Sequence, residues 1–274
     1  MPEGDGLDGL IAQWPVDKAA AGVTDRVETL AVAGDPTWAP RAASISKLMV
    51  GLAVLVAVEE ETVGLDDPAG PEGATLRHLL AHAAGYDFDT PRIIAPVGER
   101  RIYSNVGIEV AAEHLAGAAG MPFGDYLAQA VFQPLGMSSS TLTGSPAHGV
   151  HSTVPDLLRF TRELLEPSLV SAATLGEATS VQFAGLAGVL PGIGRYDPNP
   201  WGLAMEIKGG KEPHWSGSRT SPRTFGHFGG SGTFLWVDPD IGLGCVALAD
   251  REFGPWSMEA WPRLGDAVIE RYGP

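Results

Sequence analysis

Cysteine is almost absent from this chain of 274 residues, in which Cys245 is the only one. A single thiol excludes an intrachain disulfide and any zinc site built from several cysteines. Cys245 lies in the apolar segment 241–248 (Ile-Gly-Leu-Gly-Cys-Val-Ala-Leu), which is typical of a buried strand. The sequence therefore predicts an unreactive thiol in the core.

Positive charge is also scarce. The chain has 18 Lys and Arg against 33 Asp and Glu, which gives a net charge of −15. This balance argues against a nucleic-acid partner, because proteins that bind nucleic acids present a basic surface. It argues in the same way against binding to an anionic membrane surface. The simplest interpretation is an acidic surface that keeps the protein soluble, and an acidic functional patch is the alternative.

Long hydrophobic runs are missing as well. The longest, residues 48–58, is too short to span a bilayer. The first residues, Met1-Pro-Glu-Gly-Asp-Gly, have neither the basic start nor the apolar core of a signal peptide. The sequence thus predicts a cytoplasmic protein without a membrane partner.

Glycine and proline are frequent, with 36 and 22 residues, and indicate many turns. Apolar spacing divides the chain into a helix and strands, then a helical block, then strands and a closing helix. The expected helices cover residues 7–14, 44–60, 75–83, 104–118, 122–131, 154–165, 171–178 and 256–271. The expected strands cover residues 19–24, 27–33, 201–208, 224–228, 232–238 and 242–250.

The order of these elements predicts an α+β fold. The strands from both ends of the chain form one antiparallel β-sheet, flanked by the N- and C-terminal helices, with an all-helical lobe inserted. The sheet lobe would comprise residues 1–43 and 191–274, and the helical lobe residues 44–190. A cleft between the lobes would then receive the start of the helix at residue 44.

Ser44-Ile-Ser-Lys47 opens the apolar helix and places a hydroxyl and an amine one helical turn apart. Residues three apart share a face of a helix. A lysine buried there has its charged form disfavoured, so its pKa falls, and a neutral amine can take the serine proton. Ser44 is therefore a candidate nucleophile and Lys47 its base. A helix-capping serine and a solvated lysine are the alternative.

Tyr103-Ser-Asn105 is a second candidate site, because it joins a loop to the start of a helix. A tyrosine can relay a proton if a nearby cation lowers its pKa. The Asn105 amide can accept a hydrogen bond from Lys47 and donate one to a substrate carbonyl. A half-buried tyrosine and a capping asparagine explain the pattern equally well.

His227-Phe-Gly229-Gly230-Ser-Gly lies on or beside an expected strand. Its glycines allow a ligand to approach the backbone closely. The N–H groups of Gly230 and Ser44 are candidates for an oxyanion hole. A glycine-rich turn with a surface histidine is the alternative.

Tyr86 and Trp215 are candidates for walls of the substrate pocket. Tyr86 follows a glycine near the expected cleft, and Trp215 lies in a loop segment, His-Trp-Ser-Gly. For Trp215, packing in the core or in a loop is the alternative.

No metal or cofactor is expected. His78 and His82 have the i, i+4 spacing of metal ligands, but the glutamate of His-Glu-x-x-His and a third ligand are missing. His82 is expected to bond locally beneath the site instead. No glycine-rich nucleotide-binding pattern occurs, and Ser231 lacks the surroundings of a nucleophile elbow.

The motifs at Ser44, Tyr103 and His227 occur in an order that resembles the serine β-lactamase and penicillin-binding-protein superfamily. The greater similarity is to its class C-type esterases and D-aminopeptidase/carboxypeptidase-like hydrolases. Segments 76–85, 131–137 and 152–160 also resemble segments of this superfamily, and the resemblance extends from about residue 20 to 250. It implies that Ser44 is the nucleophile and Tyr103 part of the proton relay, with Lys47, Asn105, His227 and Gly229 at the matching motif positions.

This resemblance implies acyl transfer through a covalent serine ester, on a small-molecule ester, amide or β-lactam and without a cofactor. His227 stands where antibiotic-hydrolysing members usually keep lysine, which favours esters or amides. One alternative is a penicillin-binding protein that acylates without efficient turnover, and another is a non-catalytic binding scaffold. The natural substrate and the oligomeric state stay open.

Overall fold

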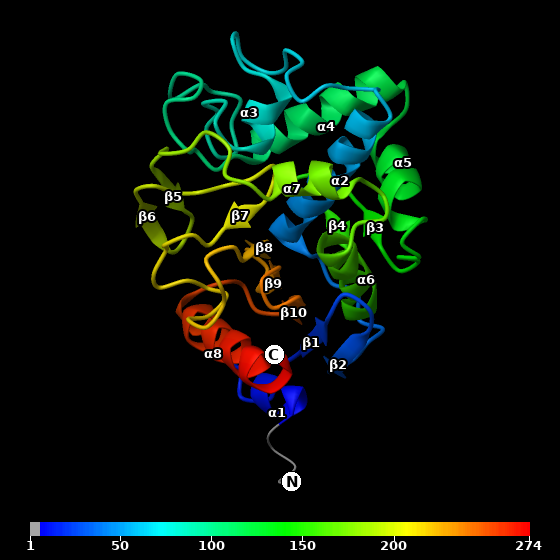
Figure 1. The fold of residues 1–274 in the computed structure, drawn as a ribbon, viewed down its shortest axis with the longest axis vertical. Coiled ribbons are helices and arrows are strands. Elements are labelled where there is room, and N and C mark those ends of the chain that lie inside the picture. Colours follow the sequence, from blue (N-terminus) through cyan, green and yellow to red (C-terminus); the bar gives the residue numbers. More distant parts are fainter. Residues whose placement is uncertain (1–5) are drawn as a thin grey trace.

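A six-stranded antiparallel sheet forms the centre of the computed structural model, which describes residues 6–274 (Figure 1). The strand order is β2-β1-β10-β9-β8-β7, so strands from the two ends of the chain lie side by side. This arrangement confirms the predicted α+β class. The strands are β1 (Ala19–Thr24), β2 (Thr29–Ala33), β7 (Glu206–Ile207), β8 (Phe225–Gly229), β9 (Thr233–Asp238) and β10 (Leu243–Ala249).

Both faces of the central strands β9 and β10 are buried. Successive side chains of a strand point to opposite faces, so an apolar run supplies both faces with core residues. On β9, Phe234 and Trp236 belong to one hydrophobic cluster, while Leu235 and Val237 belong to the other. Cys245 on β10 is fully buried, and burial raises the pKa of its thiol. The predicted inert core thiol is therefore confirmed.

Helices cover the two faces. Helices α1 (Leu7–Ile11) and α8 (Pro255–Tyr272) lie over one face. They are at the end of the molecule opposite α3 (Leu76–Leu80) and α4 (Asn105–Ala119) (Figure 1). Helix α6 (Val154–Leu165) packs on the other face, against β1, β9 and β10. It begins as its sequence predicts, with the Thr153 hydroxyl accepting a hydrogen bond from the Asp156 N–H.

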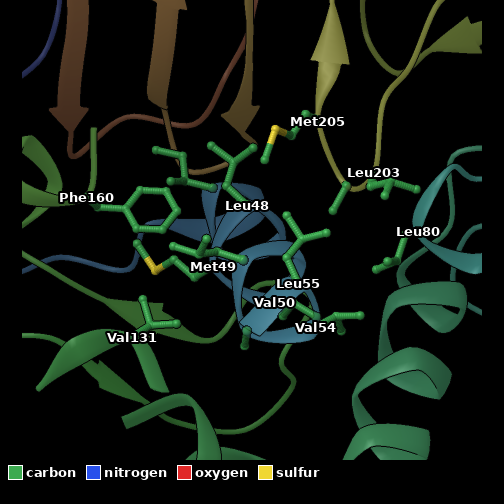
Figure 2. Close-up of a cluster of buried hydrophobic side chains, with 14 of the residues drawn as sticks. Leu48, Met49, Val50, Val54, Leu55, Leu80, Val131, Phe160, Leu203 and Met205 are labelled. Atoms are coloured by element: carbon green, nitrogen blue, oxygen red, sulfur yellow. The ribbon is translucent and has the colours of Figure 1, made fainter. Parts of the chain in front are cut away.

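Helix α2 (Ser46–Glu59) runs through the interior, and its residues 46–57 are all buried. A helix that is apolar on every side must be surrounded by protein. Figure 2 shows α2 side chains packed among residues from distant parts of the chain, including Leu80, Val131, Phe160, Leu203 and Met205. Within residues 6–274, no helix is both long enough and apolar enough to cross a membrane.

The other helices gather around α2. They are α3 (Leu76–Leu80), α4 (Asn105–Ala119), α5 (Phe123–Leu127), a π-helical turn (Ala128–Phe132) and α7 (Ala172–Ala178). Their core is continuous with the α6 face of the sheet. The division into a sheet lobe (1–43 and 191–274) and a helical lobe (44–190) stays a prediction, and α6 packs on the sheet although its residues fall in the helical range.

Two of the differences from the sequence prediction concern short strands. The strand expected over residues 201–208 is reduced to Glu206–Ile207, because the chain turns at Ala204, whose φ is 60°. Two small hairpins were not expected, namely β3 (Thr141–Leu142) with β4 (Val150–His151), and β5 (Gly188–Leu190) with β6 (Gly194–Tyr196). Strands of two or three residues are too short to show a periodic pattern.

Candidate active site

Ser44 lies on a short 3₁₀ turn (Ala43–Ile45) immediately before α2, so the helix begins two residues later than predicted. Ala43 has a φ of 49°, in the left-handed region that side chains other than glycine rarely adopt. Strand β8 packs on this turn. The turn therefore holds Ser44 at the junction of the sheet and the buried helix.

Two side chains contact the Ser44 hydroxyl. Lys47 Nζ lies 3.1 Å from Ser44 Oγ, and Tyr103 OH lies 2.8 Å from the same oxygen. Lys47 Nζ also lies 2.6 Å from Asn105 Oδ1. The structure thus brings together four candidates that the sequence spreads over sixty residues.

The remaining partners of Lys47 decide which way its lone pair points. Besides Ser44, the amine contacts Asn105 Oδ1 and the carbonyl oxygen of Ala147, at 2.9 Å. Both of these oxygens only accept hydrogen bonds, so a neutral amine gives them its two N–H groups. Its lone pair then faces Ser44, the one partner that has a proton to give.

Burial makes this neutral state accessible. Lys47 is fully buried, and desolvation lowers the pKa of its ammonium group to about 7, although the charges of Asp89 and Glu109 act to raise it. An ammonium ion without a contacting carboxylate is expensive to hold in a dry site. Lys47 therefore changes its protonation state near neutral pH.

Asn105 is oriented by a residue that the sequence analysis missed. The Asn105 Nδ2 group donates to Asp89 Oδ1 at 2.6 Å, and a carboxylate only accepts. The amide oxygen of Asn105 is thereby turned toward Lys47. Asp89 is an exposed residue of an irregular loop, and neither its type nor its spacing gave a signal in the sequence.

Tyr103 is packed among aromatic rings. Its ring lies 4.8 Å from that of His82, 5.7 Å from Trp201 and 5.5 Å from His227. Burial raises the pKa of the Tyr103 phenol, so the expectation that a nearby cation lowers it is wrong. The reason is that desolvation of the phenolate outweighs the hydrogen bond with Ser44, which acts to lower the pKa, and the charges of Glu206 and Asp89 raise it further. Tyr103 is thus a neutral hydroxyl that donates to Ser44.

His227 is buried on β8 rather than exposed in a turn. Its Nδ1 lies 2.6 Å from the carbonyl oxygen of Phe228, and burial lowers its pKa to about 3. Its Nε2 has no hydrogen-bond partner within residues 6–274. His227 therefore remains a neutral imidazole at physiological pH and supplies no positive charge to the site.

The two glycines after His227 have different surroundings. A Cβ atom at Gly229 would lie 2.3 Å from Thr233 Oγ1 and 2.7 Å from the Ala42 carbonyl oxygen. Gly229 therefore lets β8 pack directly on the turn that carries Ser44, rather than letting a ligand approach. No atom lies within 4 Å of the corresponding position at Gly230, which faces open space.

A cavity of about 230 Å³ opens at this cluster. Ser44, Tyr103, His227 and Gly230 line it on one side. Its other walls are Phe88, Leu190, Pro191, Gly192, Phe228 and Phe253. The reactive hydroxyl therefore faces a small and largely apolar space, partly formed by the β5–β6 hairpin.

Neither of the two expected pocket walls lines this cavity. Trp215 is buried in the core, where its indole N–H donates to Glu206 at 2.6 Å. The prediction that Trp215 forms a pocket wall is therefore wrong, and its alternative role, packing in the core, is the one observed. The hydrogen bond to buried Glu206 keeps the indole in the core. Tyr86 packs against the core next to Gly70 and pairs with Ile93.

The histidine pair at 78 and 82 has separate partners. His78 Nδ1 contacts the Thr75 hydroxyl at 2.8 Å, and His82 Nδ1 accepts from the Ser104 N–H at 3.2 Å. His82 thus bonds locally beneath Tyr103, as predicted. Within residues 6–274, no group of three or more His, Cys, Asp or Glu is placed to hold a metal ion.

The sequence matches the beta-lactamase family over residues 17–269. The chain belongs to the beta-lactamase family. Among solved structures, a beta-lactamase from Mycobacterium bovis is 48% identical and superimposes with a TM-score of 0.95, covering 97% of this chain and 98% of that one. Family membership and fold are therefore both secure.

More distant structures share the fold of this family member. The beta-lactamase/D-alanine carboxypeptidase of Yersinia pestis is 19% identical with a TM-score of 0.75, over 95% of this chain and 98% of that one. Simvastatin synthase of Aspergillus terreus is 16% identical with a TM-score of 0.79, over 96% of both chains. At this identity the comparison concerns the fold alone.

A curated relative is the D-alanyl-D-alanine-carboxypeptidase/endopeptidase AmpH of Escherichia coli K12. It is 24% identical over 186 residues, which are 46% of this chain. The chain spans about half the length of the curated relatives it matches, 48% in this case.

Proposed function

We propose that this beta-lactamase family member is a serine hydrolase that cleaves an ester or amide through a covalent acyl-enzyme on Ser44. One observation carries the proposal: Ser44 Oγ lies within hydrogen-bond distance of both a buried lysine, at 3.1 Å, and a neutral tyrosine, at 2.8 Å. An activated serine needs a base in contact with its hydroxyl, and Lys47 fits that role.

In the proposed first step, Ser44 Oγ attacks the substrate carbonyl carbon. The serine proton passes to the lone pair of Lys47, whose pKa of about 7 allows it to accept and return a proton at neutral pH. Asn105 and the Ala147 carbonyl hold the amine in place through its other two sites. The carbonyl oxygen becomes an oxyanion.

The N–H groups of Ser44 and Gly230 are our candidates for holding that oxyanion. Gly230 lines the same cavity as Ser44, and the space beside it is open. In other serine hydrolases one such donor contributes roughly 3–4 kcal/mol to transition-state stabilisation.

Tyr103 then completes the cycle. Its phenol keeps its proton, because burial raises its pKa, and so it can donate to the leaving group as the tetrahedral species collapses. The proton held by Lys47 restores the phenol. Water attacks the acyl-enzyme by the same proton route in reverse, which releases the acid and regenerates Ser44.

Esters and amides suit this cavity better than β-lactam antibiotics. His227 is neutral, so it offers no charge to a carboxylate next to the reacting bond. The nearby walls Leu190, Phe228 and Phe253 are apolar. The names of similar proteins, which include a carboxypeptidase and simvastatin synthase, are compatible with acyl transfer from either bond type.

The decisive test replaces the nucleophile. Ser44→Ala is expected to abolish release of the chromophore from a p-nitrophenyl ester of a short acid, without loss of the fold by circular dichroism. Ser231→Ala is the matched control, because its hydroxyl lies near the site but donates to the Arg41 carbonyl instead, at 2.9 Å. Equal rates for Ser44→Ala and the wild type would remove the assignment.

Intact-mass spectrometry separates the alternatives. The wild type mixed with the ester should give a transient adduct on Ser44 together with continuous product release. A permanent adduct with penicillin and no turnover would instead identify a penicillin-binding protein. The absence of both adduct and turnover across esters, D-alanyl peptides and nitrocefin would favour a binding scaffold.

A further inference from the structure

A second cavity adjoins the one at Ser44. Its volume is about 370 Å³, larger than the 230 Å³ of the cavity at the serine. The two cavities share Phe88, Tyr103 and Pro191 as walls. The two cavities are therefore neighbours, with these three side chains at their common border.

Exposed apolar side chains gather at this second cavity. Phe88 is 43% exposed, Ile94 38% and Val189 54%, and all three line it. Single exposed apolar residues are ordinary on protein surfaces, but a group around one cavity indicates that something covers it. Because the cavity opens beside a reactive serine, an apolar part of the substrate is the natural occupant.

Arginines complete the lining of the second cavity. Its walls include Arg100, Arg101 and Arg195 and no carboxylate, in a chain that has 33 acidic residues and 18 basic ones. Arg100 and Arg195 are exposed, and neither forms an ion pair with a carboxylate in residues 6–274. The guanidinium of Arg100 donates to the Ile94 carbonyl at 3.1 Å, which holds it against the cavity wall.

Arg101 contributes a buried positive charge to the wall of the second cavity. It is buried, and its guanidinium donates only to backbone carbonyls, among them those of Gln182, at 2.6 Å, and Ala81. Burial lowers its pKa to about 10, so it stays cationic at neutral pH. A positive charge without a contacting carboxylate leaves the region attractive to anions.

We propose that this second cavity binds the distant part of the substrate, and that this part is an apolar chain that ends in a carboxylate. The inference rests on the proposed function, because it places the reacting carbonyl at Ser44. The chain crosses Phe88 and Pro191 into the second cavity. Its carboxylate meets Arg100 and Arg195, whose planar guanidinium groups match a carboxylate in geometry.

Binding to the Ser44→Ala protein tests the cavity without turnover. The probes are the monomethyl and dimethyl esters of dicarboxylic acids from succinate to sebacate, and isothermal titration calorimetry measures their affinities. At the best chain length, the anionic monoester should bind at least tenfold more tightly than its neutral diester. Equal affinities at every length would overturn the proposal.

Two double variants in the Ser44→Ala protein locate the effect. Arg100→Gln/Arg195→Gln should reduce the preference for the monoester to near one. Arg223→Gln/Arg263→Gln removes the same charge from exposed positions elsewhere and should leave the preference intact. A preference that survives the first pair, or is lost equally with the second, would contradict the assignment.

Charge retention provides a further check. Arg100→Lys/Arg195→Lys keeps both positive charges and should retain part of the preference, which an unfolded variant would not. Failure of this proposal is distinguishable from failure of the proposed function. If the wild type does not hydrolyse esters, the proposed function is wrong. If the Ser44→Ala protein binds the monoester and the diester equally, only the proposed carboxylate site is wrong.

Discussion

Lys47 and Lys211 are both fully buried, yet their surroundings give them opposite roles. Lys211 Nζ lies 2.9 Å from Glu206 Oε1 in a buried ion pair, and the same carboxylate lies 3.1 Å from His214. Lys47 contacts only neutral oxygen atoms. A contacting carboxylate stabilises an ammonium ion, so burial alone does not leave a lysine neutral and able to accept a proton.

The titration of the two amines follows from this difference. Burial lowers the pKa of both lysines, but for Lys211 the charge and hydrogen bond of Glu206 act against it. For Lys47 the opposing charges, Asp89 and Glu109, are not in contact with the amine, and the pKa falls to about 7. Lys211 is therefore held in an ion pair, whereas Lys47 can be neutral near pH 7.

The largest expected effect is on catalysis at Lys47. Lys47→Met should lower kcat for ester hydrolysis by roughly 10²–10⁴-fold, the usual scale for a lost general base. Lys47→Arg should be equally inactive, because a guanidinium keeps its charge and cannot accept the proton. Stopped-flow measurement of acylation tests both variants, and appreciable activity of Lys47→Arg would contradict a neutral amine as the base.

Tyr103 contacts the same serine hydroxyl as Lys47. Tyr103→Phe removes the hydroxyl at 2.8 Å from Ser44 and should slow turnover by about 10²–10⁴-fold. Tyr126→Phe is the matched control, since its hydroxyl donates to Glu60 instead. If steady-state assays give the two variants the same rate, Tyr103 has only a packing role.

On the structural side, Lys211→Met should destabilise the protein by about 3–5 kcal/mol, because it leaves the Glu206 carboxylate buried without its cation. Urea denaturation measures the change in the free energy of unfolding. Glu206→Gln/Lys211→Met removes both charges and should recover part of the loss. A single variant as stable as the wild type would show that the ion pair does not hold this region together.

The smallest expected effect is a shift in the pKa of Lys47 when a distant negative charge is removed. Acylation should increase as pH rises through about 7, because Lys47 must lose its proton, and His227, with a pKa of about 3, does not titrate there. Asp89→Asn and Glu109→Gln each remove a negative charge that favours the ammonium form. The pKa of Lys47 then falls, and the midpoint of the pH–rate profile should move to lower pH by up to about one unit.

Glu113→Gln, one turn further along α4, is the control for that experiment. Glu113 is exposed and is not among the charges that act on Lys47. Its midpoint should stay at the wild-type value. A shift toward higher pH in Glu109→Gln would mean that the titrating group is not the lysine.

Local patterns explain why part of this site was predictable. The spacing of Ser44 and Lys47 on an apolar helix predicts their contact, and Tyr103 and Asn105 flank a clear helix start. The longer strands of the sheet were equally predictable. Each is an apolar or alternating apolar and polar segment between turn residues. These signals lie within a few residues of each other in the sequence.

The missed features depend on contacts between distant or irregular segments. Asp89 meets Asn105 from a loop, and Glu206 meets Lys211 within a segment that has no regular period. Lys208 and Lys211 are also buried, whereas lysine side chains usually lie in solvent. Only tertiary packing decides such positions.

The pKa of Lys47 is the most direct test of this account. With only 4 lysines, the protein labelled with ¹³C at lysine Cε gives few signals, and Lys47→Met assigns the one that matters. The Lys47 signal should titrate with a midpoint near pH 7. A Lys47 midpoint above pH 9 would contradict the account.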